Sequence, residues 1–295
     1  MAGLVGLSAV TVLLAPAASA AVRHGLRVDP LTPSLTMAWR GVGSDNTIWW
    51  SQFNGTSWGP QQDLPDRHTD AAPALLRFNP NGADAGLSND DLLMAWRGAG
   101  ADNHIWWSLY DGTRWSSPQQ LADRATAAGP ALGIGGSGIV MAWRGANSAS
   151  GDNHIWWSTF TGTGWTGQQV LADRRSDLTP GLGDDGNGHL TMVWRGVDTD
   201  NRIWWSEETS TGWTAQQVLA DRRTEATPGI SFDAYGGAMM AWRGAGADNT
   251  IWWSTLLNSV NDTNAGATTW FPQQQLGDRD TGTAPAIAIS FDYDF

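Results

Sequence analysis

The chain has 295 residues, of which 41% are hydrophobic and 10% aromatic, so it can build a sizeable core and is not a disordered chain. All 17 basic residues are arginine, and with 29 acidic residues they give a net charge of −12. Nucleic acid and anionic membrane both require a cationic surface, so this charge excludes them as partners. Cysteine is absent, so the fold depends on packing and not on disulfides.

The first 20 residues, MAGLVGLSAVTVLLAPAASA, read as a secretory signal peptide. They combine an apolar run with the small-residue pattern Ala18-Ser19-Ala20, which is typical of a cleavage site. The run is too short for a membrane anchor, and Pro16 interrupts it. A buried apolar segment is the alternative, and the missing positive residues also fit a natural start further upstream. We predict a secreted, extracellular, bacterial protein with a lead-in over residues 21–32.

From residue 33 to 295 the chain repeats one unit five times. Each copy holds W-R-G, then D-N, then I-W-W-S, a fourth Trp, Q-Q and D-R-x-[ST], and the copies together account for all 20 Trp. The W-R-G motif opens at Trp39, Trp96, Trp143, Trp194 and Trp242. Such regular self-similarity indicates five copies of one supersecondary unit, and five copies of one site.

Each copy contains four short strand-like runs separated by Gly, Asn, Asp, Thr or Pro. In the copy around Trp143 we expect strands near residues 130–134, 139–143, 155–160 and 165–171. No stretch shows a useful helical period. Four strands in a unit of about 40–50 residues are typical of a β-propeller blade, whose middle strands are buried on both faces.

The two ends of the chain predict how the blades close. A Pro motif precedes the first strand of the later blades, at Pro73, Pro130, Pro180 and Pro228, and the first copy has no good equivalent. The C-terminus carries the same motif at residues 283–289 with no unit after it. We therefore predict an all-β, five-bladed propeller of four-stranded antiparallel blades. The C-terminal strand joins the first blade and leaves no open edge.

The antiparallel order of strands brings two polar motifs to one face, between adjacent blades. D-N lies in the turn between the second and third strands, and D-R-x-[ST] is expected in the connection to the next blade. The Arg that ends the second strand and the Trp that begins the third lie close by. The predicted ligand-binding residues are Arg40, Asp45, Asn46, Trp49, Arg67, Thr69, Arg97, Asp102, Asn103, Trp106, Arg124, Thr126, Arg144, Asp152, Asn153, Trp156, Arg174, Ser176, Arg195, Asp200, Asn201, Trp204, Arg222, Thr224, Arg243, Asp248, Asn249, Trp252, Arg279 and Thr281.

Asp, Asn, Arg, Thr and an aromatic plate are the groups that sugar recognition needs. Sugar hydroxyls pair with carboxylates and guanidinium groups, and the C–H face of a pyranose stacks on an indole. Two structural alternatives remain: D-N is also good turn chemistry, and D-R is also a buried ion pair that links blades.

The repeat M-A-W-R-G-x-G-x-D-N-x-I-W-W-S-x-F-x-G-T-x-W-x-x-Q-Q resembles the bacterial fucose-binding β-propeller lectins over roughly residues 33–295. The resemblance implies sugars bound between neighbouring blades. Those lectins usually have seven repeats, and the five counted here are similar to the tachylectin-type propellers that bind N-acetylhexosamines. Residues 108–115 also resemble the Asp-box of sialidases, with the Asp shifted by one position to Asp111.

These observations predict a multivalent lectin that is not an enzyme, with glycans of the fucose or N-acetylhexosamine class as partners and no cofactor or metal. One alternative is a sialidase-like or other glycoside hydrolase. It needs paired carboxylates in one asymmetric site, and the three Glu at 207, 208 and 225 form no evident constellation. A second alternative is a non-catalytic protein-interaction propeller.

Overall fold

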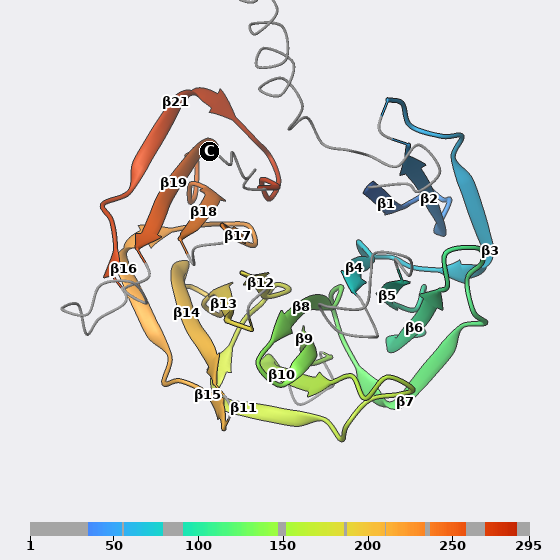
Figure 1. Cartoon of the computed structure of the whole chain (residues 1–295). Helices are drawn as coiled ribbons and strands as arrows, with labels where there is room; N and C mark the ends of the chain where they lie inside the picture. The colour runs from blue at the N-terminus through green and yellow to red at the C-terminus, as the bar shows by residue number, and fades with distance from the viewer. Residues whose placement is uncertain are drawn as a thin grey trace, which may run out of the picture. The chain divides into compact units, whose positions relative to one another are not determined.

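The computed structural model describes residues 35–54, 56–78, 91–146, 152–185, 188–209, 211–233, 237–257 and 269–287. Every regular element in these ranges is a strand, and the strands form five successive antiparallel sheets (Figure 1). This confirms the all-β class and the five blades of a β-propeller. The described residues include no helix that is long and apolar enough to cross a membrane. The predicted signal peptide and lead-in lie outside them.

The sheets follow the repeat. The first contains β1 (Leu35–Arg40), β2 (Thr47–Phe53) and β3 (Gln62–His68), and the second β4 (Ala74–Phe78), β5 (Asp91–Arg97), β6 (His104–Tyr110) and β7 (Gln119–Ala125). The third contains β8 (Ala131–Gly135), β9 (Gly138–Arg144), β10 (His154–Thr159) and β11 (Gln169–Arg175). The fourth contains β12 (Gly181–Asp184), β13 (Leu190–Arg195), β14 (Arg202–Thr209), β15 (Gly212–Trp213) and β16 (Gln217–Arg223). The fifth contains β17 (Gly229–Phe232), β18 (Ala238–Arg243), β19 (Thr250–Leu257), β20 (Thr269–Trp270) and β21 (Gln274–Asp280).

Two compact units make up the chain. The smaller unit joins Met1–Met37 to Trp50–Gln62, and the larger joins Ala38–Trp49 to Asp63–Phe295. In the smaller unit a tight turn brings the rings of Phe53 and Trp58 to 5.6 Å, and Asn54 caps it by accepting two backbone N–H bonds. The larger unit holds the four later sheets and all the polar motifs.

In the larger unit the core lies in layers between successive sheets. Trp107 of the second sheet packs with Met141 and Trp143 of the third, and Trp157 of the third packs with Met192 and Trp194 of the fourth. The middle strands are buried on both faces, as β5 and β9 show. The W-R-G tryptophans of these four sheets are at most 2% exposed. Indole rings fill these layers because each buries a large apolar area.

The inner strands start where the Pro motif predicts. Pro73, Pro130, Pro180 and Pro228 each directly precede the first strand of a sheet. The innermost strands of successive sheets contact one another, as β8, β12 and β17 do in Figure 1.

The C-terminal segment reaches the place next to β17. A Cβ on Gly229 would lie 2.8 Å from the carbonyl oxygen of Pro285, much as one on Gly181 would lie 2.5 Å from that of Pro228. Pro285 thus stands beside β17 as Pro228 stands beside β12. Of the predicted closing strand at residues 283–289, the structure describes residues 283–287 and assigns no strand to them, and residues 288 and 289 lie outside the described part.

One strand prediction needs correction. The outer strand of the third sheet, expected at 165–171, runs from Gln169 to Arg175, and Trp165 makes only an isolated bridge to Phe160. Trp165 lies ahead of the outer strand, and its ring packs edge-on against Trp107 of the preceding sheet. The D-R motif therefore lies in the outer strand and not in the connection after it. Its polar composition suits a strand with one exposed face.

Candidate functional site

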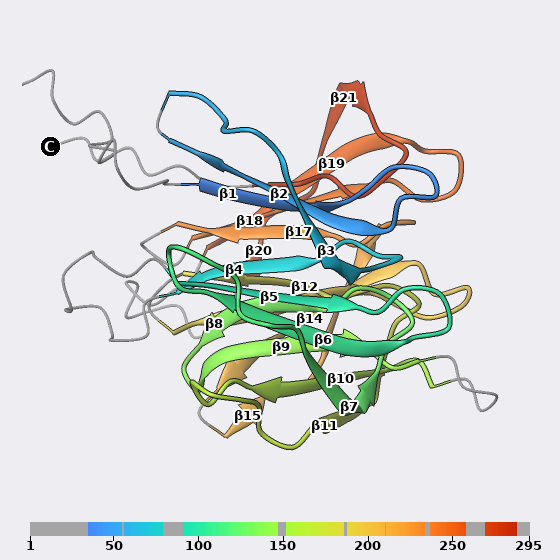
Figure 2. The same cartoon turned by 90° about the vertical axis from the view of Figure 1, so that its right-hand side faces the viewer.

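The two polar motifs meet at one end of each sheet. In the second sheet the backbone N–H of Thr126, which follows D-R, donates to the carbonyl of Asn103 in the D-N turn at 2.8 Å. The other four sheets repeat this bond, between Thr69 and Asn46, Ser176 and Asn153, Thr224 and Asn201, and Thr281 and Asn249. In the side view the β1–β2 and β5–β6 turns project to the same side (Figure 2).

The W-R-G arginines fix the D-N turn within their own sheet. Arg97 Nε donates to the carbonyl of Thr126 at 3.0 Å, and Arg40 makes the same bond to Thr69. Arg40 also donates to the carbonyl of Gly43 inside the turn at 3.0 Å. The equivalent Nε bonds join Arg144 to Ser176, Arg195 to Thr224 and Arg243 to Thr281. Each guanidinium ties the turn to the outer strand beside it.

The D-N aspartates close the turn and orient the Trp that begins the third strand. Asp102 Oδ2 accepts from Trp106 Nε1 at 2.8 Å, and Oδ1 accepts from the backbone N–H of His104 at 3.0 Å. Burial alone would raise the pKa of Asp102, but the hydrogen bonds from His104 and Trp106 lower it. The Gly of W-R-G is required because a Cβ on Gly98 would lie 2.3 Å from Asp102 Oδ2.

The same lock recurs in the other four sheets. The corresponding indole bonds join Trp49 to Asp45, Trp156 to Asp152, Trp204 to Asp200 and Trp252 to Asp248. In every repeat the carboxylate holds the indole at a fixed angle beside the turn.

The D-R arginines lie between sheets. The outer strands of the four later sheets bulge at this motif. In the second sheet Ile105 pairs with Leu121 but His104 pairs with Ala125, so the bulge turns Arg124 away from its own ladder. Arg124 Nη1 donates to Ser158 Oγ of the next sheet at 2.7 Å, and its guanidinium carbon lies 5.8 Å from the centre of the Trp143 ring. Its burial lowers its pKa.

The sheet-to-sheet arginine contact is repeated at successive junctions. Arg67, Arg124, Arg174 and Arg222 are 3–4% exposed, and each lies over the W-R-G Trp of the following sheet. The hydroxyl residues that follow them, Thr69, Thr126, Ser176 and Thr224, are fully buried. Arg279 differs, with a side chain that is 60% exposed and lies 3.9 Å from Asp278. Four of the five predicted D-R arginines thus face packed side chains and not solvent.

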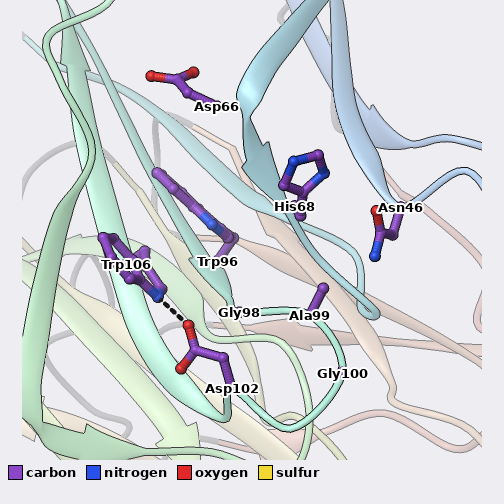
Figure 3. Close-up of a pocket in the computed structure, with 9 residues that line it drawn as sticks. All are labelled: Asn46, Asp66, His68, Trp96, Gly98, Ala99, Gly100, Asp102 and Trp106. Atoms are coloured by element: carbon purple, nitrogen blue, oxygen red, sulfur yellow. Dashed lines mark hydrogen bonds between the residues drawn. The ribbon is translucent and has the colours of Figure 1, made fainter.

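An open pocket lies between β3 and the second sheet, beside the buried Arg67 and Trp96. Its volume is about 410 Å³. Trp96, Trp106 and Asp102 form one side, with Asn46 and His68 opposite them, as Figure 3 shows. The remaining lining residues are Asp66, Gly98, Ala99 and Gly100. Asp66 has 55% of its side chain exposed at the rim, and its Oδ1 accepts a 2.6 Å bond from Arg67. The pocket combines an indole wall with carboxylate, imidazole and amide groups.

A smaller pocket of about 230 Å³ occupies the equivalent place between β7 and the third sheet. Its lining residues Asp123, Ala125, Trp143, Ala146, Asp152 and Trp156 correspond to Asp66, His68, Trp96, Ala99, Asp102 and Trp106. The seventh, Gln168, donates to the carbonyl of Asp123 at 2.7 Å. In the second sheet Pro118 stands at this position, three residues after the fourth Trp, and has no amide to make that bond.

The structure brings together part of the predicted site and adds residues to it. Of the predicted set, Asn46, Asp102, Trp106, Asp152 and Trp156 line the two pockets. The sequence pattern did not predict the Asp of the D-R motif, the W-R-G Trp or the variable residue after D-R. Variation at one position inside a repeated motif, such as His68 against Ala125, is the signal that could have revealed the last of these.

A further hollow of about 330 Å³ lies at the other end of the fourth sheet, lined in part by His189, Glu207, Glu208 and Phe232. The sequence showed no constellation of glutamates here. Glu208 is buried, and its carboxylate accepts bonds from Gly136 N at 2.9 Å and from Ser137 Oγ, so it joins the third and fourth sheets. Among the described residues, no group of three or more His, Asp or Glu side chains could hold a metal ion.

Neither a family model nor a curated protein matches the sequence. Solved structures do match. The six-bladed β-propeller lectin of the fungus Aleuria aurantia, which recognises fucose, is 10% identical with a TM-score of 0.56 over 81% of this chain and 77% of the lectin. The SapL1 lectin, solved with α-methyl fucoside, is 17% identical with a TM-score of 0.55 over 88% of this chain and 87% of its own.

A sialidase is also among the similar structures. The Hadza microbial sialidase Hz136 is 14% identical with a TM-score of 0.53, over 86% of this chain and 58% of the sialidase. At these identities the likeness establishes the fold. It confirms, at that level, the predicted resemblance to fucose-binding β-propeller lectins.

Proposed function

We propose that this protein is a multivalent carbohydrate-binding protein, a lectin, whose sugar sites lie between neighbouring sheets. The observation that carries the proposal is the pocket lined by Trp96, Trp106, Asp66 and Asp102, which recurs in smaller form at the next junction. Indole faces suit the apolar face of a pyranose, and rim carboxylates accept bonds from its hydroxyls. Fucosides bind to the Aleuria aurantia and SapL1 lectins, so fucose is the first candidate and N-acetylhexosamines are the second.

Repetition supports binding over catalysis. A glycoside hydrolase needs two carboxylates placed in one asymmetric site. Of the glutamates, Glu208 is engaged by Gly136 and Ser137, and Glu225 by Arg195 and Gly246. Several similar sites of modest affinity instead gain avidity on a glycan-coated surface. We also propose that the protein is secreted with residues 1–20 as its signal, which N-terminal sequencing of the exported protein would test.

The test of the lectin proposal is a glycan-array screen, followed by calorimetry on any saccharide that binds. The double variant Asp66→Ala/His68→Ala removes the exposed side of one pocket, so it should lower the number of sugars bound per chain by about one. We expect a modest fall in melting temperature, because Asp66 also accepts a 2.6 Å bond from the buried Arg67, so the stoichiometry is measured well below that temperature.

Arg114→Ala is the matched control, because Arg114 is 85% exposed in the turn between the third and fourth strands of the second sheet. It should leave the stoichiometry intact. Failure to bind any glycan would refute the lectin function, and an unchanged stoichiometry in the double variant would exclude this pocket as a sugar site.

A further inference from the structure

Two arginines face each other on neighbouring strands at the end of the fourth sheet that carries the D-N turn. Arg202 begins β14 and Arg223 ends β16, and they are directly paired in the antiparallel register. Like charges placed opposite each other in a sheet are destabilising. With Thr199, Asp200 and Asn201 they line a hollow of about 380 Å³.

The fold does not require this pair. The same register position holds His104 and Ala125 in the second sheet, His154 and Arg175 in the third, and Thr250 and Asp280 in the fifth. The residue of the outer strand at this position is thus alanine, arginine or aspartate in these three sheets, and of the four later sheets only the fourth pairs two arginines here. The pair of cations is a property of the fourth sheet, in a protein whose net charge is −12.

Only one of the two cations is neutralised. Arg202 Nε donates to Asp200 Oδ1 at 2.7 Å and Arg202 Nη2 to Oδ2 at 3.1 Å, while its guanidinium lies 5.3 Å from the centre of the Trp204 ring. This bidentate pair fixes the guanidinium plane at the wall of the hollow. Asp200 therefore neutralises the charge of Arg202, and the positive charge of Arg223 is not neutralised by Asp200.

The acidic neighbours of Arg223 are committed to other cations. Glu225 lies 3.4 Å from Arg195 Nη2 and accepts from the backbone N–H of Gly246 at 3.2 Å. Asp221 lies 3.8 Å from Arg222 Nε. Within the described residues the exposed guanidinium of Arg223 has no acidic partner. The hollow thus carries an excess positive charge beside the amide of Asn201 and the hydroxyl of Thr199.

We propose that the hollow formed by Arg202, Arg223, Thr199 and Asn201 binds the anionic group of an acidic saccharide, a carboxylate or a sulfate. This rests on the proposed lectin function, because it takes the anion to be carried by a sugar. Arginine suits the role because its planar fork matches both anions. The repeats are then not identical in specificity, and the fourth sheet recognises charge where the pocket beside β3 recognises neutral saccharide.

The experiment compares two saccharides that differ only in the charged group, methyl α-glucuronide and methyl α-glucoside, with inorganic sulfate as a third probe. Binding is followed through the backbone amide NMR signals of Asn201 and Arg202. The glucuronide should shift both signals and bind at least about tenfold more tightly than the glucoside, as a charge-assisted bond predicts. Raising the salt concentration should weaken it.

Arg223→Ala should remove this preference and still fold, because Ala125 occupies the same position in the second sheet. Arg114→Ala removes one charge elsewhere and should keep the preference. Equal binding of the two saccharides, or a preference that survives Arg223→Ala, would overturn the acidic site and leave the lectin function standing. Shifts with sulfate but with neither saccharide would overturn the assignment to a sugar. Loss of the lectin function itself would appear separately, as no binding of any glycan on the array.

Discussion

In four of the five repeats, the W-R-G arginine and the D-R arginine share the same chemistry but bond to different sheets. Arg97, at the end of β5, bonds to Thr126 in its own sheet, and its side chain is 17% exposed. Arg124, in the bulge of β7, bonds to Ser158 of the next sheet and is 3% exposed. One arginine shapes a turn and the other joins two blades. A repeated polar motif in a propeller therefore serves the junction as much as the ligand.

The largest expected effect comes from breaking a junction. Arg124→Ala leaves Ser158 Oγ and the carbonyl of Thr166 without their donor and removes the contact with Trp143. We expect the free energy of unfolding to fall by about 2–4 kcal/mol, measured by urea denaturation. Arg279→Ala, at the exposed counterpart, should change it by less than about 0.5 kcal/mol. Equal losses in the two variants would show that the buried arginine does not join the sheets.

A smaller effect on stability is expected from the turn arginine. Arg97→Ala removes the Nε bond to Thr126, and we expect a loss of about 1 kcal/mol. The D-N turn also forms one side of the pocket beside β3, so saccharide affinity at this junction should weaken even where the protein remains folded. Calorimetry and thermal denaturation of one variant separate the two effects. A loss of stability with unchanged binding would mean that the turn does not shape the pocket.

The smallest effect is expected at Asp111, which serves only its own turn. Bonds from Thr113 and from the backbone N–H of Arg114 lower the pKa of Asp111 to about 2. Because the folded pKa is depressed, the stabilisation is present above about pH 4 and is lost as the pH falls through about 2. Wild type and Asp111→Asn should therefore differ in melting temperature at pH 5 and converge near pH 2. A carboxyl NMR titration with a midpoint near 4 would contradict this.

The repeat, the number of blades and the inner and middle strands could all be predicted from the sequence. Trp96 and Trp143 lie in runs with no polar alternation, and such runs indicate strands that are buried on both faces. The Pro before the inner strand of each of the four later sheets marks where the sheet begins, because proline lacks the N–H that a paired strand needs. The meeting of the D-N turn and the D-R motif at one end followed from antiparallel strand order alone.

The role of each polar side chain could not be predicted in this way, because it depends on how neighbouring sheets pack. The D-R motif is an example. Its Arg is turned toward the next sheet by a bulge, as at Arg124, while its Asp stays exposed, as at Asp66. The replacement of Gln168 by Pro118 matters only because that amide bonds to an adjacent sheet. A local pattern records turn and strand chemistry. Whether a charged side chain is buried, and which group it points to, depends on residues about 40 positions away, such as Thr166 for Arg124. Only the folded chain brings these residues together.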